Sequence, residues 1–401
     1  MNLIIKKILR LFNLKFIFSL PEKKDLLIFD DEALIDLRYF VEEFNYTVLR
    51  TRVENFNELN LNPKILFKTL FNFRGNIVNA YLISLIKEIS PKIILTNIDN
   101  SWKFSEIARV LNTKYKFFAI QQGSRHDFKS YEHRFKQGIY KKNMNKIFFI
   151  PNLFCFGDFE IDDYKKFQIQ VKNFYPVGSL RLANFIHQNK IDITKKKDYQ
   201  YDICLISDSM VLNFDKKFGT KNDIERFGKY LRFIIKYVRE NNKKFICAFA
   251  KINSSKKILE GELLFYKTFL EQDNYNFLIE NSSLNFNKNR YLTYDLMLKS
   301  NLSISAFSTL IREHMSIGRK AISINFMKND LFEFPINGDC KLGECEFDNF
   351  KYHIDKVLAS NEVDYLNSFD KPVSYLMKYD KYHSTFIKIK ELLKKHIRQN
   401  L

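Results

Sequence analysis

The chain has 401 residues, 46% of them hydrophobic and 28% charged, with only 11 glycines and 7 prolines. This composition is typical of a globular protein and excludes collagen-like or long disordered tracts, and the length predicts two domains because single hydrophobic cores stop growing at roughly 250–300 residues. The formal net charge of +19 calls for an anionic partner, a nucleotide phosphate or an anionic membrane surface, whereas specific nucleic-acid binding is not expected because zinc-finger spacing and RNP-like segments are missing.

The first twenty residues, 1–20, are apolar but interrupted by Lys6, Lys7, Arg10 and Lys15. These charges exclude a membrane-spanning helix and a signal peptide. The pattern predicts an amphipathic helix on an anionic membrane, and the alternative is a helix packed on the protein's own surface. The five cysteines are odd in number and predict reduced thiols. The expected location is the cytoplasm, where an N-terminal membrane helix would hold the protein peripherally on the inner face of the cytoplasmic membrane.

Short apolar runs alternate with helical patterns through the first half of the chain. The expected strands are Asp25–Asp30, Tyr46–Arg50, Lys92–Asn97, Tyr115–Ile120, Leu153–Phe156 and Phe174–Val177, and the expected helices are Glu32–Phe44, Phe67–Ile89 and Ser101–Leu111. Strands and helices that alternate at this spacing predict a parallel sheet with crossover helices. Ligands of such sheets bind beyond the carboxyl ends of the strands.

The second half repeats the alternation. The expected strands are Tyr201–Ile206, Lys244–Phe249, Asn276–Ile279, Leu302–Phe307 and Lys320–Ile324, and the expected helices are Asp223–Glu240, Lys256–Glu271, Asp295–Lys299, Ser308–Ile317, Phe350–Ala359 and Ser384–Ile397. The predicted organisation is an amphipathic segment at 1–20, a Rossmann-like domain at 21–183, a linker at 184–199, a second Rossmann-like domain at 200–372 and C-terminal helices at 373–401.

Polar residues follow two neighbouring strands of the first predicted sheet. The third strand leads into Asn97-Ile98-Asp99-Asn100, and the fourth into the loop Gln121–Asp127. Because adjacent parallel strands end at the same edge of a sheet, Asp99 is expected within reach of this loop. The alternative role for Asp99 is to cap the helix that begins near Ser101.

The strand Leu302–Phe307 runs directly into a helix at Ser308 and Thr309. Free backbone N–H groups and two hydroxyls at a helix N-terminus favour an anion such as a phosphate. Glu313, about one turn later, is expected to face the same crevice, where a carboxylate suits ribose hydroxyls. The alternative is an ordinary capped helix, with Ser308 or Thr309 as the N-cap.

Four stretches along the chain form a recognisable series: Thr96–Asn100, Ile120–Arg125, Pro176–Leu180, and Ser308–Glu313 with Gly318–Lys320. In their order and spacing the chain resembles the bacterial surface carbohydrate biosynthesis proteins, distant relatives of the GT-B glycosyltransferases that build capsule and lipopolysaccharide. The resemblance implies an α/β fold of two Rossmann-like domains that face a cleft, with C-terminal helices. Ala306 and Phe307 depart from it, because an acidic or small polar residue is expected there.

The resemblance also implies where the substrates bind. A nucleotide-sugar donor would bind mainly to the second domain, and a glycan or lipid-linked acceptor to the first. Ser308 and Thr309 would hold the donor phosphates, and Glu313 the ribose. Lys251, just past the strand Lys244–Phe249, would add a positive charge at the leaving phosphate.

Sugar transfer needs a base that deprotonates the acceptor hydroxyl. Asp99 is the first candidate, and His126 oriented by Asp127 is the rival. Acceptor or phosphate binding is expected from Asn97, Gln122, Gly123 and Arg125, the last of which could grip an anion in bidentate fashion.

The sequence has no Asp-x-Asp pair in a suitable loop and no metal-ligand spacing. A metal-independent reaction without cofactor is therefore expected, with the nucleotide-sugar as substrate. The leading function is a glycosyltransferase of surface polysaccharide synthesis. The alternatives are a sugar-nucleotide epimerase, a CDP-polyol phosphotransferase and a non-catalytic assembly subunit of the same fold.

Overall fold

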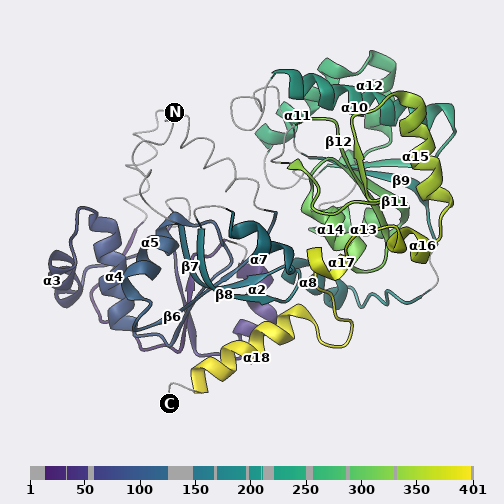
Figure 1. Ribbon diagram of the computed structural model, residues 1–401. Helices are drawn as coiled ribbons and strands as arrows, with labels where there is room; N and C mark the ends of the chain where they lie inside the picture. Colours follow the sequence, from purple (N-terminus) through teal and green to yellow (C-terminus); the bar gives the residue numbers. More distant parts are fainter. Residues whose placement is uncertain are drawn as a thin grey trace.

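Two parallel sheets, each in its own α/β domain, organise the chain (Figure 1). The computed structural model describes residues 14–32, 34–52, 58–124, 148–166, 169–195, 198–208, 210, 221–249, 256–285, 290–328 and 332–398. Within these residues every strand pair of both sheets is parallel. The predicted α/β class is confirmed.

The first sheet has the strand order β3-β2-β5-β6-β7-β8. Its strands are β2 (Leu26–Phe29), β3 (Tyr46–Leu49), β5 (Ile93–Thr96), β6 (Lys116–Ile120), β7 (Phe148–Cys155) and β8 (Ile169–Pro176). One face packs on α4 (Ile77–Ile89) and α5 (Trp102–Leu111), and the other on α2 (Leu34–Val41), α8 (Leu180–Gln188) and α18 (Thr385–Arg398). The central strands are mostly apolar because helices cover both of their faces.

The second sheet has the order β10-β9-β11-β12-β13. Its strands are β9 (Tyr201–Ile206), β10 (Phe245–Ala248), β11 (Ser300–Ser305), β12 (Lys320–Asn325) and β13 (Lys341–Gly343). The helices of this domain are α10 (Lys221–Glu240), α11 (Lys256–Phe269), α12 (Gln272–Glu280), α13 (Leu292–Leu298), α14 (Thr309–Ser316), α15 (Phe347–Ala359) and α16 (Glu362–Asn367). One hydrophobic core joins the sheet to these helices.

Three element predictions are wrong. The expected strand Asn276–Ile279 belongs to helix α12, and only a single bridge, Cys247 to Ser282, continues the sheet there. The long helix predicted at Phe67–Ile89 is broken into α3 (Pro63–Phe71) and α4, because Gly75 takes a positive φ of 84° and Asn76 caps α4.

The N-terminal helix prediction is also wrong over the part that the structure describes. Residues 15–17 form strand β1 (Lys15–Ile17), which pairs with β4 (Glu58–Asn60) in a small parallel sheet. Strand pairing with a distant segment overrides the local helical pattern. Residues 1–13 lie outside the described residues. Among the helices that are described, none is long and apolar enough to cross a membrane.

The C-terminal segment returns to the first domain after α17 (Val373–Leu376). The Lys378 amide donates to the Phe156 carbonyl at 2.8 Å, and the Thr385 hydroxyl donates to the Val177 carbonyl at 2.9 Å. Gly178 has φ +90°, and a Cβ there would lie 2.0 Å from the Lys378 carbonyl oxygen. Only glycine fits at this crossing.

The Gly178→Ala substitution is therefore expected to destabilise the protein by roughly 2 kcal/mol more than Gly318→Ala, because it adds overpacking to backbone strain. Gly318 is the matched control, since it also has a positive φ of 75° but a Cβ added there would meet nothing within 4 Å. Urea unfolding of both variants measures the difference. Equal losses of stability would contradict this account of the crossing.

Candidate functional site

Asp99 lies in the loop after β5, at the carboxyl edge of the first sheet. Asp99 has no exposed surface, and its Oδ1 accepts a hydrogen bond from the backbone amide of Gln122 at 3.3 Å. The predicted proximity of Asp99 to the loop after β6 is thus confirmed. The Ser101 hydroxyl accepts from the Phe104 amide and caps α5, so the alternative role of Asp99 as the cap is wrong. Asn97 is buried in the same loop.

The loop after β6 meets the N-terminus of α14 across the domain interface. Thr309 Oγ1 accepts from the Ser124 amide at 2.8 Å and donates to the Ser124 hydroxyl at 3.2 Å. Gly123 is close enough that a Cβ there would lie 3.6 Å from the same Thr309 oxygen. Ser308 is the N-cap, and its hydroxyl accepts from the Leu310 amide. The loop after β6 and the start of α14, two polar stretches that the sequence places at strand ends, are therefore in contact.

Asp208, which follows β9, occupies the backbone N–H groups just before α14. Its carboxylate accepts from the Ala306 amide at 2.9 Å, the Phe307 amide at 3.1 Å and the Ser305 hydroxyl at 2.6 Å. Burial raises the pKa of Asp208 to about 6, although these hydrogen bonds oppose the rise. The turn therefore binds an anion supplied by the protein itself. Sequence reasoning missed Asp208, whose signal was its place at a strand's carboxyl end.

Glu313 is buried and points toward the first domain. Tyr294 donates to its Oε2 at 2.7 Å, and Ser179, the N-cap of α8, donates to its Oε1. Burial raises the pKa of Glu313, and the two hydroxyl donors act against that rise. In this arrangement both carboxylate oxygens have protein partners, so Glu313 links the domains, and its contact with a ribose stays a prediction.

A buried ion pair also crosses the interface. The Arg312 guanidinium donates to Glu160 Oε1 at 3.1 Å, and both side chains are at least 94% buried. Glu160 also accepts from the Gln121 amide group at 3.2 Å and from the Gly157 backbone amide at 3.1 Å. Burial raises the pKa of Glu160 to about 6, and the positive charge of Arg312 limits the rise. The loop after β6 is therefore held at Gln121 by Glu160 and at Ser124 by Thr309.

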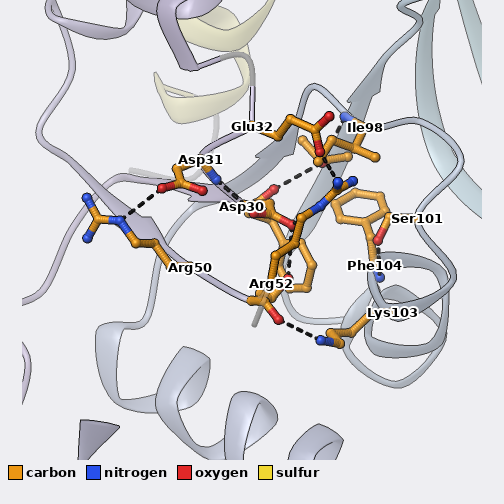
Figure 2. A network of polar contacts seen from close by, with 12 residues as sticks. Asp30, Asp31, Glu32, Arg50, Arg52, Ile98, Ser101, Lys103 and Phe104 are labelled. Carbon is orange, nitrogen blue, oxygen red and sulfur yellow. Dashed lines mark hydrogen bonds and ion pairs between the residues drawn. The ribbon is translucent and has the colours of Figure 1, made fainter. Parts of the chain in front are cut away.

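A second polar cluster lies at the carboxyl ends of β2 and β3 (Figure 2). Asp30 is buried, has φ +80°, and accepts hydrogen bonds from Arg52 and Thr51, each at 3.1 Å. Lys103 donates to the Thr51 carbonyl at 2.8 Å, and burial lowers the pKa of Lys103. A non-glycine residue in this backbone region is strained and is held there by its neighbours. Sequence reasoning noted only that this strand ends in acidic residues.

Four predicted site residues, Arg125, His126, Asp127 and Lys251, lie outside the described residues. Among the residues that are described, no group of three or more His, Cys, Asp or Glu side chains is arranged to hold a metal ion. The expected absence of a metal and of a cofactor stays an expectation. The geometry that can be described consists of Asn97, Asp99, Gln122, Gly123, Ser308, Thr309 and Glu313.

Comparison with known proteins identifies the fold. No protein-family model and no curated protein sequence matches the chain. Among solved structures, a protein assigned as a UDP-N-acetylglucosamine 2-epimerase from Listeria monocytogenes superposes with a TM-score of 0.50 at 10% identity, over 94% of this chain and 98% of that one. The chain therefore has two Rossmann-like domains in a GT-B-like fold, as the sequence predicted.

Two further solved structures are similar. The UDP-GlcNAc 2-epimerase from Neisseria meningitidis, bound to UDP-GlcNAc, has a TM-score of 0.49 at 12% identity and covers 93% of this chain and 99% of its own. The wall teichoic acid polymerase TagF, soaked with CDPG, has a TM-score of 0.48 at 10% identity, with coverages of 94% and 90%.

Proposed function

We propose that the chain is a glycosyltransferase that moves a sugar from a nucleotide-sugar donor to a surface polysaccharide or lipid-linked glycan. The observation that carries the proposal is the contact between Ser124 and Thr309. It joins the loop beside Asp99 to the N-terminus of α14, so one substrate can reach groups of both domains. The reaction would take place on the cytoplasmic side of the membrane, during synthesis of capsule or lipopolysaccharide.

The donor would bind at the turn before α14. Its N–H groups already hold the carboxylate of Asp208, which supports a preference of this turn for negative charge. A donor phosphate would contact the hydroxyls of Ser308 and Thr309 beside this occupied part of the turn. Lys251 would add a positive charge, and the reaction would need no metal ion.

The acceptor would bind on the first domain beside Asp99, through Asn97, Gln122, Gly123 and Arg125. The Asp99 carboxylate would remove the proton from the attacking acceptor hydroxyl as the nucleotide leaves the donor sugar. His126 and Asp127 remain the rival pair for the same proton. An epimerase on this fold would convert the nucleotide-sugar without any acceptor, which separates that alternative from transfer.

Thermal shift with UDP-, CMP-, CDP- and GDP-sugars and with a CDP-polyol is expected to identify one nucleotide-sugar as the stabilising donor. A donor at about 100 times its Kd raises the free energy of unfolding by about 2.7 kcal/mol. The Thr309→Val variant should bind that donor about fivefold more weakly, because it loses the hydroxyl proposed to contact the phosphate together with its hydrogen bonds to Ser124. Thr268→Val on the surface of α11 is the matched control and should bind it normally.

The outcomes separate the candidate functions. Stabilisation by no nucleotide-sugar would contradict the proposal and favour a non-catalytic subunit. Stabilisation by a CDP-polyol alone would favour the phosphotransferase, and turnover of the donor without an acceptor would favour the epimerase.

A further inference from the structure

Helix α3 buries only Ile65 and Thr69 against the protein and turns most of its apolar side chains toward solvent. The outward face carries Leu66, Phe67, Leu70 and Phe71, with exposed fractions from 41% to 75%. Phe73 and Ile77, at the turn into α4, are each 52% exposed. We call these six side chains the α3 surface. Removing their apolar area from water would be favourable by about 25 cal/mol per Å².

The inward side of α3 is held by polar contacts. The buried Glu88 of α4 pairs with Lys68 and, at 3.0 Å, with Lys64. Asn72, the C-cap of α3, donates to the Ser84 hydroxyl at 2.8 Å. A helix that packs onto its own domain usually buries most of its apolar side chains, whereas α3 buries only Ile65 among its leucine, isoleucine and phenylalanine residues. The hydrogen bonds thus fix the apolar face outward.

The α3 surface continues onto the segment around β1. Phe16 is 51% and Phe18 is 65% exposed, and Asn62, the N-cap of α3, donates to the Phe18 carbonyl at 2.7 Å. Figure 1 shows α3 at the end of the first domain that is remote from the second domain. The apolar face therefore lies on the α3–α4 pair, at the end of the first domain away from the second domain.

The charges around this face are basic. The segment 63–89 contains four cations and one acid: Lys64, Lys68, Arg74, Lys87 and Glu88. Glu88 pairs with Lys64 and Lys68 and offsets one of their charges, so four cations and one acid leave the segment with a net charge of +3. Burial and the nearby charge of Lys114 lower the pKa of Lys87, as do two further cations of the group. The whole chain carries a net charge of +19.

We propose that the α3 surface docks the protein onto a lipid bilayer that contains anionic headgroups. The phenylalanine and leucine side chains would enter the boundary between headgroups and acyl chains, while the exposed Arg74 and the exposed parts of Lys64 and Lys68 face the phosphates. A convex apolar face with a basic rim fits this occupant, because anionic headgroups complement the charge and the acyl chains take up the protruding side chains. The inference does not depend on the transfer chemistry proposed above.

The test is co-sedimentation of the full chain with vesicles of phosphatidylcholine and phosphatidylglycerol. The F67Q/F71Q double variant is expected to bind about tenfold or more weakly than the unaltered protein. Arg74→Gln should weaken binding about fivefold on these vesicles, and not on phosphatidylcholine alone. The matched control is Y352Q/V363Q, which removes two side chains of similar exposure from the second domain and should bind normally.

A second variant guards against a folding artefact. In Phe67→Trp the new indole should shift its fluorescence to the blue on adding the anionic vesicles, which shows directly that this position enters the bilayer. Vesicle binding by F67Q/F71Q equal to that of the unaltered protein would overturn the proposal. A lack of vesicle binding by the unaltered protein would also overturn the proposal. If the unaltered protein were then found to be a dimer and the F67Q/F71Q variant a monomer, the α3 surface would be assigned to contact with a second copy of the chain.

Discussion

The Asp99→Asn variant is expected to turn over the donor about 10²–10⁴-fold more slowly than the unaltered protein, with the same donor affinity. Asparagine keeps an oxygen that can accept the Gln122 amide hydrogen bond, so the loop should keep its shape. What is lost is the base that removes the acceptor proton. The measurement is the rate of nucleotide release with acceptor present, beside donor binding by thermal shift.

Asp25→Asn is the matched control for this experiment. Asp25 lies before β2 at the opposite edge of the same sheet, where it pairs with Lys92 at 3.0 Å. It should transfer sugar at the normal rate. A normal rate in Asp99→Asn would instead assign the proton transfer elsewhere, with His126 as the next residue to replace.

Arg312→Met is expected to destabilise the protein by about 3–5 kcal/mol, because it leaves the buried carboxylate of Glu160 without its cation. Methionine has a similar length and keeps the packing, so the lost charge dominates the effect. Urea unfolding measures the free-energy change. The E160Q/R312M double variant should recover most of the loss, since neither an unpaired charge nor a large cavity remains.

The destabilisation by Arg312→Met should depend on pH. The pKa of Glu160 is raised by burial to about 6, above the value of 4.5 expected for an unfolded chain. A raised pKa stabilises the fold at low pH, and that contribution is lost as the pH rises through the folded pKa. Removing Arg312 raises the pKa further. The loss of stability should thus be larger at about pH 8 than at about pH 5, and a loss independent of pH would contradict a charged Glu160.

The sequence predicted the sheets because buried parallel strands such as Leu26–Phe29 are continuous apolar runs bounded by polar residues. It failed at α12, where Phe277 and Leu278 resemble the start of a strand. It also did not predict β13, whose three residues have little apolar character. Such short elements owe their form to neighbours that local patterns do not include.

Only the part of the candidate site that follows from the order of strands in one sheet could be predicted. The proximity of Asp99 to Gln122 follows from adjacent strand ends. The contact of Ser124 with Thr309 joins residues 185 positions apart, and that of Asp208 with Ala306 joins residues 98 positions apart. No local spacing encodes how two domains meet.

The return of α18 to the first domain has a consequence for synthesis on the ribosome. Phe386, Ile389 and Leu393 of this helix complete one face of the first sheet, whereas the last strand of that sheet ends at Pro176. More than 200 residues are translated in between, which takes about 10–40 s at roughly 5–20 residues per second. During that time the part of this apolar face that α18 covers stays exposed on the nascent first domain, so general chaperones that bind such faces should associate with it until α18 has been synthesised.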